Sequence, residues 1–386
     1  MRKHTSIAIL VLSFLMLSLV GACRPGPSTT GKPKLIVGAA LSKTAGAAAY
    51  GSDADLGAKL AVKELNAQAD FPFNIEYIAL DDKSDQTEAT KVARTLIDVN
   101  KANVILGPAI SPSALSVGKL AEDRQIPIVS TSATLDTVTW SNSYDRKYVF
   151  RVCFNDSYQG KVLAKFATDS LKLKKAAIIY DKTLPYSIGL SNTFRAEFTS
   201  LGGQVIHEEN YSVTDTDYSA LIDKVALFDV DLLFIPGWDE NVGPMLKQSG
   251  DKWKKFTLLG GDGWPTNRLL DLSGGNIEKA YALSHYSTED PTPEVKSFNE
   301  AFQKEYNAQS TPFNALGYDA MMLIADAAKR AKSVDGKQLR EALSKTDGLQ
   351  LVTGTIRFDE HRNPQKDAIV VQIRSDKIVF HSRVKP

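Results

Sequence analysis

Short continuous apolar runs alternate with amphipathic segments along most of the chain after residue 33. The runs lack polar residues at alternate positions, which is typical of strands covered on both faces in a parallel sheet. The segments between them repeat apolar residues every three or four positions, as helices with one buried face do. This pattern predicts strands at residues 35–40, 75–80, 104–106, 126–129, 176–180, 205–207, 232–235 and 256–259.

The strand and helix units fall into two similar series, residues 34–150 and 151–282, joined by the apolar segment 148–152. Further helical patterns follow, and two more apolar runs, 355–358 and 369–373, close the chain. Strands that alternate with helices imply right-handed βαβ units. We therefore predict an α/β protein whose ligand site lies in the loops beyond the carboxyl ends of the strands.

The N-terminus has the order of a secretory signal, because Arg2 and Lys3 precede an apolar run at residues 7–20 and small residues follow it. This run is shorter than the ~20 residues that a membrane-spanning helix needs. The order of residues therefore predicts a signal peptide at residues 1–22.

The segment Val-Gly-Ala-Cys at residues 20–23 resembles the lipobox of bacterial lipoproteins, in which the signal is cut before a cysteine that is then lipidated. The resemblance implies a lipid anchor at Cys23 and a protein held at a membrane of the cell envelope. Ordinary cleavage near Ala22, which leaves the thiol free, is the alternative. Residues 23–33 are rich in Pro, Gly, Ser and Thr, and predict a flexible tether.

The composition excludes several classes of protein. The 386 residues hold 46 Lys and Arg against 45 Asp and Glu, a formal charge of +1, so the chain has no cationic excess for nucleic acid. An apolar content of 43% excludes a disordered chain and a polytopic membrane protein. Cys23 and Cys153 are too few for a disulfide framework or a four-ligand zinc site. We expect Cys153 to be a core residue.

Catalytic motifs are missing from the sequence as well. It has no Gly-x-Ser-x-Gly, His-Glu-x-x-His or Gly-x-Gly-x-x-Gly pattern. Asp81, Asp82 and Asp85 could form a cation site, but we favour carboxylates that cap the next helix. We predict no enzyme, no metal site and no cofactor.

Residues suited to bind a small molecule instead gather after the predicted strands. They are hydroxyls, aromatic rings and one carboxylate, at Tyr50, Ser111, Ser132, Thr134, Tyr186, Trp238 and Asp262. Ser111 begins a predicted helix, and helix N-termini favour anions. The plainer alternatives are a helix cap for Ser111, loop shaping for Asp262 and packing within one lobe for Trp238.

From residue 34 nearly to its C-terminus, the chain resembles the type I periplasmic binding proteins, specifically the Leu/Ile/Val-binding family of ABC-transporter solute receptors. The resemblance is carried by seven short segments that follow one another in order. They are Ala49-Tyr50-Gly51, Asp81-Asp82-Lys83-Ser84-Asp85, Gly107-Pro108 with Ser111, Ser132-Ala133-Thr134, Val149-Phe150-Arg151-Val152, Asp217-Tyr218-Ser219-Ala220 and Gly354-Thr355-Ile356-Arg357-Phe358-Asp359.

The resemblance implies two Rossmann-like lobes with parallel central sheets, joined by a three-segment hinge. The implied N-terminal lobe comprises residues 34–150 and 285–353, and the C-terminal lobe comprises residues 151–284 and 354–386. The implied crossings between the lobes lie near Phe150, Ser284 and Gly354.

An α-amino acid held between the lobes is the ligand that the resemblance implies. Ser111 and Thr134, with Ser132 in the same loop, match the residues that bind the ligand carboxylate. Asp262 matches the acidic residue that pairs with its ammonium group. The implied lining of the side-chain pocket is Tyr50, Tyr186 and Trp238.

The predicted function is that of an exported, lipid-anchored solute receptor of an ABC importer. We expect a monomer that binds an aliphatic or aromatic amino acid and docks on a membrane permease. The alternative is a sensor of amides or aromatic carboxylates that takes no part in transport.

Overall fold

The computed structural model describes residues 31–384. The predicted signal peptide 1–22, Cys23 and most of the predicted tether 23–33 lie outside the described residues. The residues from Lys34 onward form one compact unit. Within the described range, no helix is long and apolar enough to cross a membrane.

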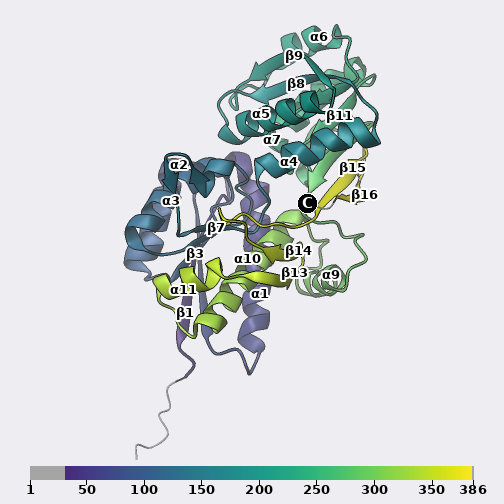
Figure 1. The fold of residues 1–386 in the computed structure, drawn as a ribbon. Helices are drawn as coiled ribbons and strands as arrows, with labels where there is room; N and C mark the ends of the chain where they lie inside the picture. The colour runs from purple at the N-terminus through teal and green to yellow at the C-terminus, as the bar shows by residue number, and fades with distance from the viewer. Residues whose placement is uncertain (1–30, 385–386) are drawn as a thin grey trace, which may run out of the picture. The chain divides into compact units, whose positions relative to one another are not determined.

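Five parallel strands form the first sheet (Figure 1). They are β1 Lys34–Leu41, β2 Asn74–Asp81, β3 Val104–Leu106, β4 Ile128–Ser130 and β7 Val149–Arg151. Their order, β2-β1-β3-β4-β7, is that of a doubly wound α/β sheet. The helices of this series are α1 Ala48–Ala67, α2 Gln86–Arg94 and α3 Ser111–Arg124.

Seven strands form the second sheet. They are β8 Lys175–Asp181, β9 Gln204–Tyr211, β10 Leu232–Phe234, β11 Thr257–Gly260, β12 Ala280–Ser284, β15 Ala368–Ile373 and β16 Ile378–Val384. Their order is β16-β15-β12-β11-β10-β8-β9, in which β15 and β16 are antiparallel to their neighbours and the other pairs are parallel. The helices of this series are α4 Asp156–Lys165, α5 Pro185–Ser200, α6 Ser219–Ala226, α7 Asp239–Ser249 and α8 Asn267–Ser273.

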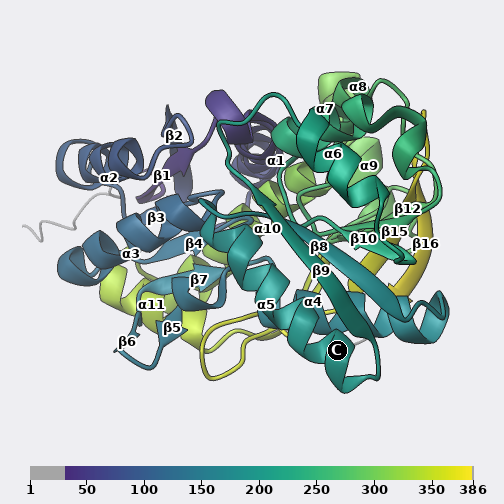
Figure 2. The same cartoon turned by 90° about the horizontal axis from the view of Figure 1, so that it is seen from above.

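The remaining elements follow β12 or form short excursions. They are α9 Pro293–Tyr306, α10 Pro312–Ala331, α11 Gly336–Ser344, the hairpin of β13 Asp347–Leu351 and β14 Gly354–Arg357, and the pair β5 Trp140–Ser141 and β6 Tyr144–Asp145. We call the first sheet with α1–α3 and α9–α11 the first lobe. The second sheet with α4–α8 is the second lobe. Figure 2 shows α4 and α5 side by side next to β8 and β9.

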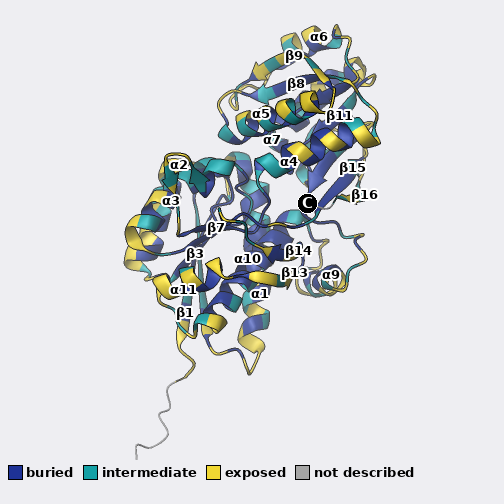
Figure 3. Cartoon of the chain, viewed as in Figure 1, coloured by how far each residue is buried: buried dark blue, intermediate teal, exposed yellow. Residues whose placement is uncertain are grey.

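Apolar strands make up the core of each lobe (Figure 3). β3, β4 and β10 are buried at every position, as the continuous apolar runs predict. The observed α/β fold with two parallel-sheet lobes confirms the predicted fold class. Cys153 is fully buried, and burial raises the pKa of its thiol to about 12, so it is an unreactive core residue.

The third crossing between the lobes lies later than the sequence indicates. Gly354, where we expected it, has φ +121° and lies at the turn of the β13–β14 hairpin. Arg362 then forms an ion pair with Asp145, and Asn363 accepts a hydrogen bond from Thr139 at 3.2 Å. Both partners belong to the first lobe, so the chain leaves this lobe only between these residues and β15.

Candidate ligand-binding site

A small cavity lies where loops after the strands of both lobes converge. Its first-lobe lining includes residues that follow β3 and β4, and its second-lobe lining includes residues that follow β10 and β11. The lining residues are Tyr50, Ala109, Ile110, Ser111, Ser132, Tyr186, Trp238, Asp262, Gly263 and Phe313. Six of the seven predicted site residues are therefore brought together, and Thr134 is the exception.

The Asp262 carboxylate is the main charged group of this cavity, and it is only 5% exposed. Its Oδ1 accepts hydrogen bonds from the Tyr186 hydroxyl and the Gln159 amide, both at 3.1 Å. Its Oδ2 lies 3.0 Å from Nε2 of His285. Burial lowers the pKa of His285 to about 4, so at neutral pH this imidazole is neutral and donates to the carboxylate. All three donors are thus uncharged.

Glycine next to Asp262 allows this close approach. A side chain at Gly261 would place its Cβ 2.3 Å from the Tyr186 hydroxyl and 2.9 Å from Oε1 of Gln159. Gln159 also accepts the Asp262 backbone N–H at 2.7 Å, which fixes the loop from a second direction. Trp264 is fully buried and donates to the Ile235 carbonyl, so it packs in the second lobe and does not line the cavity.

The first-lobe side of the cavity presents hydroxyls and the start of a helix. Ser111 is the first residue of α3, and Ile110 occupies the N-cap position without a side-chain hydrogen bond. Ser111 is therefore not the helix cap, and its hydroxyl accepts the Leu135 N–H at 3.2 Å. The Ser132 hydroxyl donates to the Ala109 carbonyl at 2.7 Å, which ties the loop after β4 to the loop after β3.

Tyr50 joins the two lobes within the site. It lies on α1, yet its hydroxyl donates to the Gly263 carbonyl at 3.0 Å and accepts the Asp239 N–H at 3.2 Å. Its ring packs on Phe313, with ring centroids 4.5 Å apart. It also contacts Trp238 edge to face, with ring centroids 6.3 Å apart. The cleft is thus bridged by an aromatic side chain that was predicted only as pocket lining.

Thr134 is not among the residues that line the cavity. Its carbonyl accepts the Asp156 N–H at 2.8 Å, so it contacts the first turn of α4. Burial raises the pKa of the Asp156 carboxyl group well above its usual range, and Asp262 and Asp136 add to this effect. Thr134 therefore lies beside a buried carboxyl group, and its predicted role with a ligand carboxylate stays a prediction.

The acidic cluster after β2 braces a loop and caps a helix. Asp85 is the N-cap of α2 and accepts the N–H groups of Thr87 and Glu88, both at 2.8 Å. Asp81 and Asp82 instead accept hydrogen bonds from the loop at residues 42–44. Among residues 31–384, no group of acidic, His and Cys side chains has the arrangement of a metal site.

Sequence reasoning missed two partners of Asp262. Gln159 lies on α4 and His285 follows β12, and neither belongs to a motif or to the predicted cleft loops. For His285 the sequence does contain a signal. The apolar run at residues 281–283 indicates a strand, and residues just beyond the carboxyl end of such a strand are candidates for the ligand site.

The family model for periplasmic binding proteins matches residues 34–377. The chain is 27% identical over 344 residues to Leu/Ile/Val-binding protein homolog 1 of Brucella suis, which covers 87% of this chain and 89% of the relative.

Two solved structures are also similar to the chain. A leucine-binding protein of Thermotoga maritima superposes with a TM-score of 0.85 at 30% identity, over 91% of this chain and 99% of the other. The branched-chain amino acid transporter substrate-binding protein of Streptococcus pneumoniae, solved with isoleucine, has a TM-score of 0.85 at 28% identity, over 92% of this chain and 100% of the other.

Proposed function

Because the chain belongs to the periplasmic binding protein family, we propose that it is the receptor of an ABC importer and binds an aliphatic amino acid between its lobes. The predicted resemblance to the Leu/Ile/Val-binding family agrees with these relatives, and so does the prediction of a binding protein without catalysis.

Asp262 is the observation that carries the proposal. A buried carboxylate is costly unless a cation or several hydrogen bonds compensate it. Its three partners, Gln159, Tyr186 and His285, are neutral, and no Lys or Arg among residues 31–384 forms an ion pair with it. A ligand ammonium group supplies the missing positive charge, whereas a ligand that is only an anion would be repelled.

The opposite wall suits the ligand carboxylate. Ser111 begins α3, and the N-terminus of a helix attracts anions through its backbone N–H groups and dipole. The Ser132 hydroxyl lies on the same wall. An amino acid with its carboxylate at Ser111 and its ammonium at Asp262 would contact both lobes and stabilise the closed form.

The rest of the lining favours a small apolar side chain. Tyr50, Tyr186, Trp238, Ile110 and Phe313 present mostly carbon surface.

A thermal-shift panel of amino acids, aromatic acids and amides tests this proposal. A compound that binds the folded state raises the unfolding midpoint, so we expect aliphatic L-amino acids to raise it and aromatic acids to leave it unchanged. Asp262→Asn should reduce the affinity roughly tenfold to a hundredfold, because a hydrogen bond to a charged group contributes ~1.5–3 kcal/mol. A panel in which no amino acid raises the wild-type midpoint would contradict the proposal.

Cys23 carries the second part of the proposal, an anchored receptor outside the cytoplasmic membrane. Family membership implies export to the periplasm or envelope. The lipobox-like segment at residues 20–23 supports lipidation after cleavage, and residues 23–33 would form the tether. Cys23→Ala should move the protein from the membrane fraction to the soluble fraction, and unchanged membrane association would contradict the anchor.

A further inference from the structure

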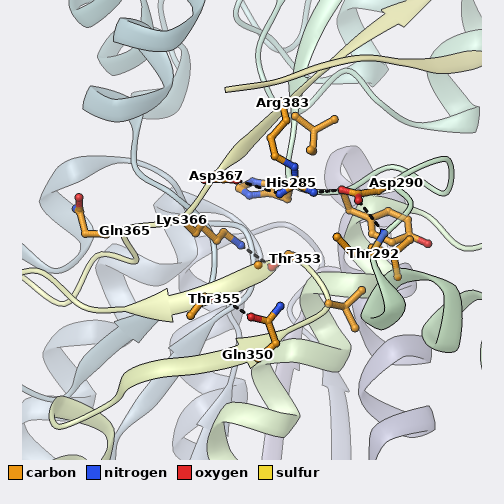
Figure 4. A pocket seen from close by; sticks show the side chains of 15 residues that line it. His285, Asp290, Thr292, Gln350, Thr353, Thr355, Gln365, Lys366, Asp367 and Arg383 are labelled. Carbon is orange, nitrogen blue, oxygen red and sulfur yellow. Dashed lines mark hydrogen bonds and ion pairs between the residues drawn. The ribbon is translucent and has the colours of Figure 1, made fainter. Parts of the chain in front are cut away.

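The imidazole of His285 lies between the ligand site and the hinge. His285 directly follows β12, at the start of the second crossing between the lobes, and is 2% exposed. Its ring stacks on Phe154 of the first crossing, with centroids 3.7 Å apart and planes 24° apart. Figure 4 shows that His285 and Lys366, which belongs to the third crossing, line one cavity.

The two ring nitrogens have different surroundings. Nε2 holds the proton that is donated to Oδ2 of Asp262, because the buried ring is neutral and its partner is a carboxylate. Nδ1 is then an acceptor, and it is buried without a hydrogen-bond partner among the described residues. One hydrogen bond to Asp262 and one stacking contact to Phe154 therefore hold the ring.

Asp262 is bound unevenly by its partners. Its Oδ1 is held by Gln159 and Tyr186, which lie on α4 and α5 of the second lobe. Within residues 31–384, only His285, which belongs to a crossing, binds its Oδ2. A new interaction at Oδ2 therefore acts directly on His285, which lies in a crossing between the lobes.

We infer that His285 is a positioning residue that transmits occupancy of Asp262 to the hinge between the lobes. The inference rests on the proposed function, in which a ligand ammonium group binds Asp262. The ammonium group shares Oδ2 with His285, so the imidazole shifts against Phe154 and biases the first crossing. A ligand without an ammonium group leaves this hydrogen bond unchanged and does not drive closure.

Two substitutions of His285 distinguish the effect of its hydrogen bond to Asp262 from that of its stacking on Phe154. His285→Phe keeps an aromatic ring against Phe154 and removes the donor, whereas His285→Gln keeps an amide N–H donor. His207→Phe is the matched control, because His207 stacks on Phe228 at the same centroid distance of 3.7 Å but on β9. The full mature protein is titrated with L-leucine, L-isoleucine and L-phenylalanine, and both calorimetric affinity and the radius of gyration at saturation are measured.

We expect His285→Phe to weaken the affinity about tenfold and to lose the compaction at saturation. His285→Gln should keep affinity within about threefold and retain the compaction, and His207→Phe should behave as wild type. A purely structural role would lower the thermal midpoint of the variants and leave compaction at saturation unchanged. Wild-type compaction in His285→Phe, or no rescue in His285→Gln, would contradict the inference.

If the proposed function is wrong, the result differs, because none of the three amino acids would then bind the wild-type protein. That result would also contradict the inference about His285. If His285→Phe does not fold, imidazole ¹⁵N spectra of the wild-type protein provide the second measurement. The Nε2 signal of His285 should shift on amino acid binding and that of His207 should not. An unchanged His285 signal in the saturated protein would contradict the inference.

Discussion

Tyr50 is the side chain that bridges the lobes inside the site. Its hydroxyl bonds to Gly263 and Asp239 of the second lobe, while its ring packs on Phe313 of the first. Tyr50→Phe removes the bridging hydrogen bonds and keeps the packing. We expect about a fivefold loss of amino acid affinity by calorimetry, because the closed form loses ~1 kcal/mol.

Tyr144→Phe is the matched control for this variant. The Tyr144 hydroxyl donates to the Thr137 carbonyl at 2.7 Å, and both residues belong to the first lobe. Its loss should lower the unfolding midpoint and leave the affinity unchanged. Equal losses of affinity in the two variants would show that Tyr50 does not act through the contact between lobes.

His285 also makes stability depend on pH. Burial lowers the pKa of its imidazole from 6.5 to about 4, and the charged groups that face it are Asp262 and Lys366. Between these two pH values the unfolded chain binds a proton that the folded protein does not, so stability falls as the pH falls. The wild-type midpoint should drop more than that of His285→Gln from pH 7 to pH 4.5.

Asp53 and Asp239 change the stability in the opposite direction over part of the same pH range. Burial raises the pKa of each carboxyl group to about 6, so the folded state binds their protons first and gains stability as the pH falls. Both groups are present in wild type and in His285→Gln, so their effect cancels in the difference. Parallel pH profiles of the two proteins would contradict a neutral, buried His285.

Several of the predicted site residues share one property, which is a place in a loop after a strand. Asp262, Trp238 and Ser132 were predicted because the carboxyl ends of parallel strands meet at one edge, and all three line the cavity. Gln159 reaches the site from a helix face, and no local pattern distinguishes it from other polar residues on α4. Its role depends on the packing of α4 against the β11 loop, which the sequence does not specify.

Helices α1 and α10 meet through glycines. A Cβ at Gly57 would lie 1.8 Å from the Asn314 carbonyl oxygen, and a Cβ at Gly317 would lie 2.0 Å from that of Ala54. Gly317→Ala should therefore push the helices apart and cost roughly 1–3 kcal/mol or more of unfolding free energy, measured by urea denaturation.

Gly118→Ala on α3 is the matched control, because the nearest atoms to its Cβ would be those of the Arg146 side chain, at 3.0 Å and 3.1 Å. A flexible side chain can move aside, and alanine favours helix, so the change should stay within about 1 kcal/mol. Equal destabilisation by both substitutions would contradict a close contact between α1 and α10.

Among the strands, β10 was predictable from its continuous apolar run, whereas β16 at the edge of the second sheet was not. β10 is buried throughout, whereas β16 has no fully buried residue and pairs only with β15. The third crossing between the lobes was expected near Gly354, but Gly354 lies at the turn of the β13–β14 hairpin. β13 and β16 are mostly exposed or half-buried, so they lack the continuous apolar run that indicates a buried strand.

At the scale of the whole molecule, the two lobes share one small cavity, which is the proposed ligand site. Ser111 and Ser132 come from one lobe, and Asp262 and Tyr186 come from the other. The α/β class and the pair of lobes followed from the alternation of strands and helices. The hydrogen bond from His285 to Asp262 did not, because it joins a crossing to a loop through tertiary packing alone.

The most direct test of the central claim compares calorimetric affinities for L-leucine and 4-methylpentanoate, which is leucine without its ammonium group. Both carry the same apolar chain and carboxylate, so only the interaction with Asp262 differs. We expect L-leucine to bind at least about tenfold more tightly in the wild-type protein, and Asp262→Asn to reduce this difference. Equal affinity for the two compounds in the wild-type protein would contradict the account.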